Sequence, residues 1–181
     1  RKARVIITKN IDRPAQPELI SGSEKLNPSI LAIPRYWLEH DQVANALSDL
    51  RWERNWLLAQ KKVTSPTNER THIATLLPFS ATAESLHVFI LSNAINIRNV
   101  SAFYTNLNSF VFDYVTRQKI GGVNFNYFVL EQLPAIAPSN YSKIWLSFIT
   151  PRVLELTYTA YDLRPFAQDC GYDGPPFRWD E

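Results

Sequence analysis

Cationic and amide side chains surround a pair of glycines in the stretch TRQKIGGVNFNYF, residues 116–128. Arginine and lysine bind phosphate oxygens through charge-assisted hydrogen bonds, and glycine lets a backbone approach a partner closely. The stretch therefore predicts contacts with a nucleic-acid backbone. The candidate residues are Arg117, Gln118, Lys119, Gly121, Gly122 and Asn124. A purely structural interpretation is equally open, in which a helix ends here and the chain turns back.

A second polar stretch, TNER at 67–70, follows Pro66 in an expected turn between two strands. Arg70 can donate a pair of hydrogen bonds to guanine or hold a phosphate, and Asn68 can pair with adenine. These two residues complete the set of candidate DNA contacts. The structural alternative is that Glu69 and Arg70 form an internal ion pair while Asn68 caps the turn.

Motifs that would mark a catalytic or metal centre are not found. His40, His72 and His87 lie far apart in the sequence without metal-ligand spacing, and each is expected on the surface or partly buried. Glycine-rich phosphate loops, nucleophile elbows and zinc-protease motifs are missing as well. The DGPPF stretch at 173–177 has Gly174 directly before its prolines, so it predicts a polyproline-type turn. The chain is therefore not expected to be an enzyme by itself, and no cofactor or metal is expected in it.

Composition indicates one globular domain with an attached arm. The chain has 181 residues, of which 45% are hydrophobic and 20% charged, enough for a core and too apolar for disorder. No apolar run approaches the roughly 20 residues that span a bilayer, so no membrane partner is expected. The single Cys170 fits a reducing cytoplasm. A net charge of +2 predicts that the chain supplies only part of any DNA-binding surface.

The elements that would position these residues form a predicted α+β fold, a twisted, largely antiparallel sheet with a few packed helices. Residues 55–63, 71–79 and 86–91 read as an antiparallel group of strands, and RVIIT at 4–8 as a further strand. A proline-rich segment from Asp12 to Pro34 reads as a loop or arm. A helix is predicted from about Glu39. Its apolar stripe would hold Val43, Leu47 and Leu50.

Two longer helices are predicted further on. One covers 101–120, with Ser101 or Thr105 as its cap, Arg117 and Lys119 in its last turn, and Gly121 as a left-handed C-cap. Its core face is expected to hold Leu107, Phe110, Val111, Tyr114 and Val115. The second begins at Thr150 as N-cap, with Pro151 in the first position. Aromatic residues expected in the core or at a domain contact are Trp37, Trp52, Trp56, Trp145, Phe125, Tyr127 and Phe128.

Three blocks together carry a family resemblance. NLNSFVFDYVTRQKIGGVNFNYFVLEQLP (106–134), TNERTHIATLLP (67–78) and PRYWLEHDQV (34–43) resemble the C-terminal specificity region of large adenine-specific DNA methyltransferases. These are bifunctional type II restriction-modification enzymes and their phage-defence relatives. The order of the blocks and the terminal GPPFRWDE match the same family, over roughly residues 30 to 180.

The resemblance implies a target-recognition domain that grips double-stranded DNA opposite a separate catalytic methyltransferase domain. The catalytic domain would hold S-adenosylmethionine and methylate adenine N6 on a flipped base. Residues shared by enzymes of different specificity suit phosphate contact better than base choice. The variable loops 80–86 and 92–100, with Asn96 and Arg98, are then the expected readers of sequence. The absence of methionine and the abrupt ends suggest a piece of a longer protein.

The predicted organisation has three parts: residues 1–33 as an N-terminal strand and proline-rich arm, 34–165 as a target-recognition-like domain, and 166–181 as a truncated C-terminal tail. The competing hypothesis is a structural or protein-interaction module that docks a catalytic domain or partner without reading bases. The low net charge and the five tryptophans support that alternative.

Overall fold

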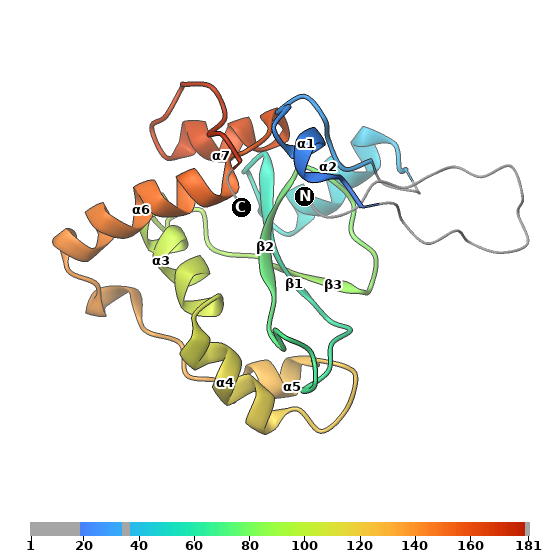
Figure 1. The fold of residues 1–181 in the computed structure, drawn as a ribbon, viewed down its shortest axis with the longest axis vertical. Coiled ribbons are helices and arrows are strands. Elements are labelled where there is room, and N and C mark those ends of the chain that lie inside the picture. The colour runs from blue at the N-terminus through green and yellow to red at the C-terminus, as the bar shows by residue number, and fades with distance from the viewer. Residues whose placement is uncertain (1–18, 34–36, 180–181) are drawn as a thin grey trace, which may run out of the picture.

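A computed structural model describes residues 19–33 and 37–179 and shows the α+β fold predicted from the sequence (Figure 1). Within this part of the chain, one antiparallel sheet has the order β2-β1-β3. The strands are β1 (Trp56–Lys61), β2 (Ala74–Pro78) and β3 (Leu86–Phe89). The expected antiparallel group is therefore confirmed. The predicted strand at 4–8 and residues 12–18 and 34 of the proline-rich segment lie outside the described residues.

The central strand β1 is covered on both faces. Trp56 pairs with Pro78 in one neighbouring strand, and Leu58 pairs with both Leu76 and Phe89. The first five residues of β1 are buried, because both faces are packed and no face alternates toward water. The Trp56 ring lies edge-on to Trp52 and Phe166. The strand is thus the axis of the hydrophobic core.

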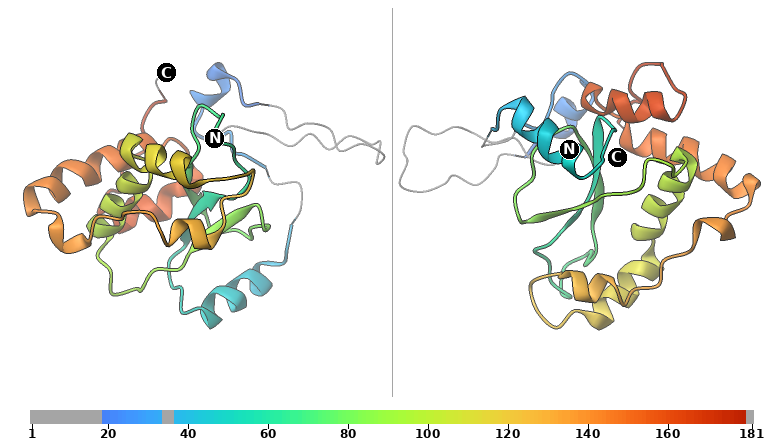
Figure 2. Two further views of the ribbon diagram at one scale, coloured as in Figure 1. Left: turned by 90° about the horizontal axis from the view of Figure 1, so that it is seen from below. Right: turned by 180° about the vertical axis from the view of Figure 1, so that it is seen from behind.

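Helices cover the sheet from two sides (Figures 1 and 2). Helices α3 (Ile97–Leu107) and α6 (Lys143–Thr157) pack against each other on one side. Helix α2 (His40–Asp49) lies on the other side and buries Leu47 against the core, with Val43 packed beside it. The helix predicted from Glu39 is confirmed, since Glu39 is its N-cap, but Leu50 is exposed.

Short elements complete the described chain. They are α1 (Gly22–Lys25), α5 (Tyr127–Leu130), α7 (Arg164–Asp169) and the 3-10 turns η1 (Pro138–Asn140) and η2 (Tyr161–Leu163). Helix α7 crosses the predicted boundary between domain and tail. Phe166 and Ala167 are fully buried, so the core continues beyond that boundary.

The single helix predicted over 101–120 is wrong, because the structure has two. Helix α3 ends at Leu107, and α4 (Phe110–Lys119) begins after Ser109. Asn108 supplies the break: its side chain donates to Tyr104 O at 3.1 Å and accepts from Ala74 N at 3.3 Å. Ser109 Oγ then caps the new helix by accepting from Phe112 N at 3.1 Å. The predicted caps Ser101 and Thr105 instead lie inside α3.

The predicted core face of this segment is wrong in part, although Leu107 is buried and Val115 packs against the core. Phe110, Val111 and Tyr114 are exposed on α4, whereas Phe112, Asp113 and Thr116 are buried. Arg117 and Lys119 do lie in the last turn of α4, as predicted. Gly121 is not a left-handed cap, because its φ lies outside the positive region. The helix ends instead with Ile120 in an extended conformation.

The aromatic residues predicted in the core or at a domain contact are buried in some cases and exposed in others. Trp52, Trp56 and Phe125 are buried, but Trp37, Trp145, Tyr127 and Phe128 are exposed. The predicted last helix begins earlier than expected, since Ser142 caps α6 and Pro151 lies in its interior. Across the described ranges, no helix combines the length and apolarity that a bilayer span requires.

Candidate nucleic-acid interface

Two segments that are far apart in the sequence meet at one end of the molecule, beside α4 and α5 (Figure 1). We call residues 61–72 and 117–125 together the loop end. Thr64 N donates to Val123 O at 2.9 Å, and Phe125 N donates to Lys62 O at 2.7 Å. Val63 and Asn124 form an isolated antiparallel bridge. The loop end contains the eight candidate contacts of the 116–128 and TNER stretches, but not the expected sequence readers Asn96 and Arg98.

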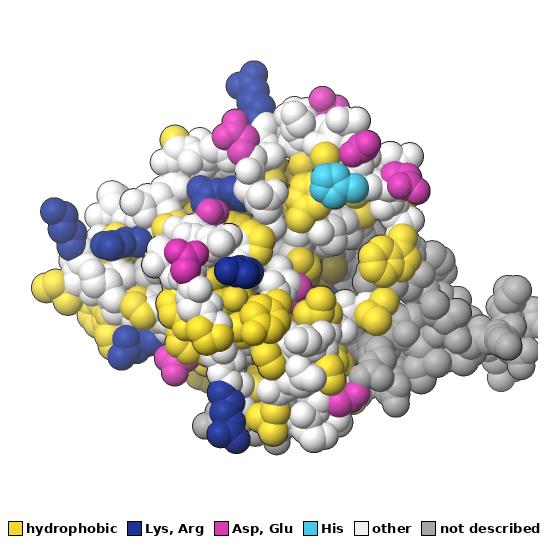
Figure 3. Space-filling model, turned by 90° about the horizontal axis from the view of Figure 1, so that it is seen from above, with side chains coloured by type: hydrophobic (Ala, Val, Ile, Leu, Met, Phe, Trp, Pro, Cys, Tyr) yellow, Lys and Arg dark blue, Asp and Glu magenta, His cyan; other side chains and the backbone are white. Residues whose placement is uncertain are grey.

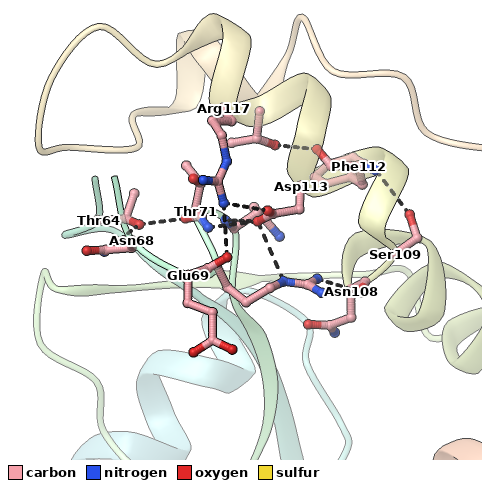
Figure 4. Close-up of polar contacts among 12 residues, drawn as sticks. Thr64, Asn68, Glu69, Thr71, Asn108, Ser109, Phe112, Asp113 and Arg117 are labelled. Carbon is pink, nitrogen blue, oxygen red and sulfur yellow. Dashed lines mark hydrogen bonds and ion pairs between the residues drawn. The ribbon is translucent and has the colours of Figure 1, made fainter. Parts of the chain in front are cut away.

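A buried carboxylate, Asp113 on α4, organises this end (Figure 4). Its Oδ1 atom accepts hydrogen bonds from the backbone N–H groups of Thr71 at 2.8 Å and His72 at 2.7 Å. Its Oδ2 atom accepts from Arg117 at 3.2 Å, and Arg70 Nε lies 3.7 Å from Oδ1. The Asp113 side chain is 7% exposed. It therefore ties the 65–72 turn to α4.

The environment of Asp113 favours its ionised form. Burial alone would raise the pKa of this carboxyl group, but the hydrogen bonds from His72, Arg117 and Thr71 and the nearby charge of Arg70 outweigh it. The net effect lowers the pKa of Asp113. A charged carboxylate at this position is thus part of the folded state.

Arg117, on α4, also connects this helix to the 65–72 turn. Its Nη1 donates to Pro66 O and its Nη2 to Glu69 O, each at 3.0 Å. Arg70 Nη2 donates to Asn108 O at 2.7 Å. These contacts give both arginines a structural role. The Arg117 side chain nevertheless remains 32% exposed, and the Arg70 side chain 30% exposed. The structural interpretation of Arg117 is therefore confirmed, and its contact with phosphate stays a prediction.

The structural alternative for TNER predicted an internal ion pair of Arg70. Such a pair is present, but Glu69 is not the partner. Arg70 pairs with Asp113 rather than with Glu69, because the carboxylate on α4 is buried beside it while Glu69 is exposed. Asn68 makes a turn contact through its N–H to Ser65 O at 3.1 Å. Its side chain reaches only 3.5 Å from Thr64 Oγ1, so most of the Asn68 amide faces solvent.

The remaining predicted contacts are open to a partner. Gln118, Lys119, Gly121, Gly122 and Asn124 are all exposed. The Lys119 ammonium group has no ion pair or hydrogen bond with any other described residue. The backbone N–H groups of 121–124 likewise donate no hydrogen bond within the described ranges. Open space surrounds both glycines, so a ligand atom can approach these amides.

Of the two loops expected to read sequence, the 80–86 loop contacts the loop end through Lys62, whereas Asn96 and Arg98 of the 92–100 loop make no contact with it among the described residues. Asn96 caps α3, because its Oδ1 accepts from Arg98 N at 2.8 Å. Arg98 lies in the first turn of α3, whereas the loop end follows α4. A helix of this length separates its two ends by about 15 Å. In the 80–86 loop, Glu84 forms an ion pair with Lys62. The Lys62 ammonium group therefore already has an internal partner, whereas Lys61 is exposed.

Burial sets the protonation state of two further side chains, His72 and Cys170. His72 is fully buried rather than at the surface, with its ring between Phe112 and Phe125. Burial lowers its pKa to about 4 despite a hydrogen bond to Leu107. Burial also raises the pKa of Cys170 to about 12, with Asp169 adding to the effect, so the thiol stays protonated at neutral pH. His, Cys, Asp and Glu form no candidate metal cluster among the described residues.

Charge is distributed sparsely over the molecule. Lysines and arginines equal aspartates and glutamates in number among the described residues. The end opposite α4, seen in Figure 3, shows basic side chains scattered among acidic and hydrophobic ones. At the loop end, two guanidinium groups face one buried carboxylate, Lys62 pairs with Glu84, and Lys61, Lys119 and Glu69 are exposed. The local balance there is modestly positive.

Comparison with known proteins yields no relative: no protein-family model, curated protein or solved structure matches the chain.

Proposed function

We propose that this chain is the DNA target-recognition module of an adenine-N6 DNA methyltransferase from a restriction-modification or phage-defence system. In this proposal the loop end lies on the backbone of double-stranded DNA. A separate catalytic domain holds S-adenosylmethionine and receives the flipped adenine. The observation that carries the proposal is the meeting of the 61–72 and 117–125 segments, which gathers the eight predicted contact residues at one end.

The chemistry of the loop end suits phosphate. Lys119 is unpaired within the described ranges, and the amides of 121–124 offer consecutive N–H donors. Backbone amides and lysine fix a protein on DNA without reading its sequence. Arg70 and Arg117 add positive charge beyond what Asp113 neutralises. This arrangement predicts binding that depends strongly on salt and weakly on sequence.

Lys119→Ala tests the phosphate contact. The variant is expected to weaken binding to unrelated duplexes equally and to flatten the salt dependence of log K by about 0.9. Fluorescence anisotropy of a labelled duplex at several salt concentrations measures both quantities. Lys143→Ala, at an exposed lysine at the start of α6, is the matched control. Equal losses for the two variants, or no duplex binding by the unmodified chain at low salt, would contradict the proposal.

A second candidate function, a protein-interaction module, is favoured by α6. Its outer face exposes Ile144, Trp145, Phe148 and Leu156. The Arg152 guanidinium lies 3.6 Å from the Phe148 ring centroid. A helix with apolar residues on all sides is normally covered by another element, and contiguous apolar patches mark interaction sites. The face suits docking of a catalytic domain or another partner.

Phe148→Asp tests this second candidate. Without its partner, the chain is expected to associate with itself as its concentration rises, because the apolar face of α6 is exposed. The substitution places a charge in that face and should abolish the association, as measured by sedimentation velocity. Leu50→Asp, at an exposed leucine after α2, is the control and should still associate. A chain that stays monomeric throughout would count against the interaction module.

A further inference from the structure

The outer face of α4 carries aromatic rings beside guanidinium groups. Phe110 is 81% exposed and Tyr114 is 65% exposed, and they are followed by the exposed Gln118 at the same four-residue spacing. We call the two rings of Phe110 and Tyr114, together with the polar Gln118 that continues their row, the aromatic stripe. The Arg70 guanidinium carbon lies 5.0 Å from the centroid of the Phe110 ring. Arg117, one turn beyond Asp113, flanks the same stripe.

The exposure of these rings follows from what α4 buries instead. Asp113 and Thr116 face inward because Asp113 accepts the backbone N–H groups of the 65–72 turn. That orientation turns Phe110 and Tyr114 outward, although both would gain from burial. The fold thus maintains two exposed rings next to partly exposed cations. A ligand for this surface must offer flat apolar faces together with negative charge.

An unpaired DNA strand has this chemistry. Bases stack on aromatic side chains, and a cationic groove follows the phosphates. Successive rings of the stripe are separated by roughly 6 Å along the helix, which is wider than the roughly 3.4 Å between stacked nucleotides of one strand. The rings therefore suit bases that have left the stack. In an intact duplex the base faces are covered by their neighbours, so a duplex offers the rings no comparable surface.

We infer that the aromatic stripe binds an unpaired segment of DNA, with bases on Phe110 and Tyr114 and phosphates on Arg70, Arg117 and Lys119. The inference rests on the proposed DNA-binding function and specifies the state of the strand at the same end of the molecule. The phosphate contacts use the N–H groups that the arginines leave open to solvent. Binding of this kind tolerates any base sequence, because every base has a flat face.

The test uses the whole 181-residue chain and two labelled probes, oligodeoxythymidine of about 15 nucleotides and a duplex of the same length. The double variant Phe110→Ala/Tyr114→Ala is expected to bind the single strand at least tenfold more weakly. Its affinity for the duplex should stay within about twofold. Tyr114→Phe keeps the ring and should bind normally. Leu19→Ala, at a leucine that is 71% exposed and outside the apolar face of α6, is the control, and thermal melting checks folding.

Each outcome separates the inference from the proposed function. Binding of the duplex without the single strand overturns the inference and leaves the proposed function standing. Binding of neither probe overturns both. Single-strand binding that the double variant leaves unchanged also overturns the inference, since the rings then take no part. If the double variant instead loses only self-association, the stripe is a protein contact and the inference fails.

Discussion

Asp113→Ala is expected to lower the free energy of unfolding by about 3–5 kcal/mol, the usual cost of removing one partner of a buried charged pair. The substitution leaves the N–H groups of Thr71 and His72 without an acceptor. Buried donors that lose their partner carry a desolvation penalty. Arg117 and Arg70 also lose the carboxylate that they share. Urea denaturation followed by circular dichroism measures the loss.

Glu69→Ala is the matched control for this prediction. Glu69 belongs to the same joint, but only its backbone oxygen takes part, by accepting from Arg117. Figure 4 shows its carboxylate directed away from Asp113. Its removal should change the free energy of unfolding by less than about 0.5 kcal/mol. Similar losses for Asp113→Ala and Glu69→Ala would show that the buried carboxylate does not organise the loop end.

The sheet and the first long helix could be predicted from local patterns. Strands 55–63, 71–79 and 86–91 are apolar runs bounded by turn residues, and their antiparallel pairing needs only short connections. Helix α2 shows an apolar stripe whose Leu47 does reach the core. In these elements the local pattern and the tertiary packing agree, so the pattern was sufficient.

Helix α4 could not be predicted in the same way. Its apolar periodicity favours Phe110, Val111 and Tyr114 as the core face, but the structure turns the opposite side inward. The cause is Asp113, which takes its hydrogen bonds from a turn about forty residues earlier in the sequence. No local pattern reveals such a partner. The available signals were an acidic residue within an apolar run and the Asn108-Ser109 pair, whose side chains favour helix ends.

The candidate site shows the same limit at single residues. Arg117 and Lys119 have the same charge and lie two positions apart, and both were predicted as phosphate contacts. Two positions correspond to about 200° around a helix, so their side chains face different surroundings. Arg117 meets the backbone oxygens of Pro66 and Glu69, while Lys119 meets solvent. Residue type alone selected both cations as candidates. Only the fold shows that Arg117 is held by internal hydrogen bonds and that Lys119 is exposed.

The free energy of unfolding is expected to fall by about 3 kcal/mol as the pH is lowered from 6.5 to about 4, because of His72. Burial lowers the pKa of this imidazole from 6.5 to about 4 in the folded chain. Between these pH values His72 is protonated in the unfolded chain and neutral in the folded chain. Stability therefore rises with pH across this window. Above pH 6.5 the group is neutral in both states and contributes no further dependence.

The contacts of His72 explain why the neutral ring belongs to the fold. Its Nδ1 lies 2.9 Å from Leu107 O, and a carbonyl only accepts, so this nitrogen carries the proton. Its Nε2 lies 3.0 Å from the oxygen Oε1 of the fully buried Gln60 side chain, and an unprotonated Nε2 and an amide oxygen are both acceptors. Rotation of that amide brings its nitrogen, otherwise unpaired, to the imidazole as a donor. Two aromatic rings pack around the imidazole and exclude water.

His72→Asn should remove most of this slope, measured as urea-derived stability at several pH values between 4 and 6.5. The slope is read within each variant, so a lower overall stability of the variant does not affect the comparison. A smaller slope should remain, because burial also lowers the pKa of His87 and the Lys62 hydrogen bond lowers the pKa of Glu84 from 4.5. Asp113, whose pKa is lowered from 3.8, adds most of its loss below this window.

A second measurement keeps the prediction testable if His72→Asn does not fold. The ring proton signals of His72 in the unmodified chain, followed by NMR, should show no protonation until the pH approaches 4. Titration near 6.5, or a stability that stays flat across the window, would mean that water reaches the imidazole. The turn that Asp113 holds through His72 N would then be looser than the structure shows. The loop end would in that case lack the rigid support on which its proposed contact with DNA depends.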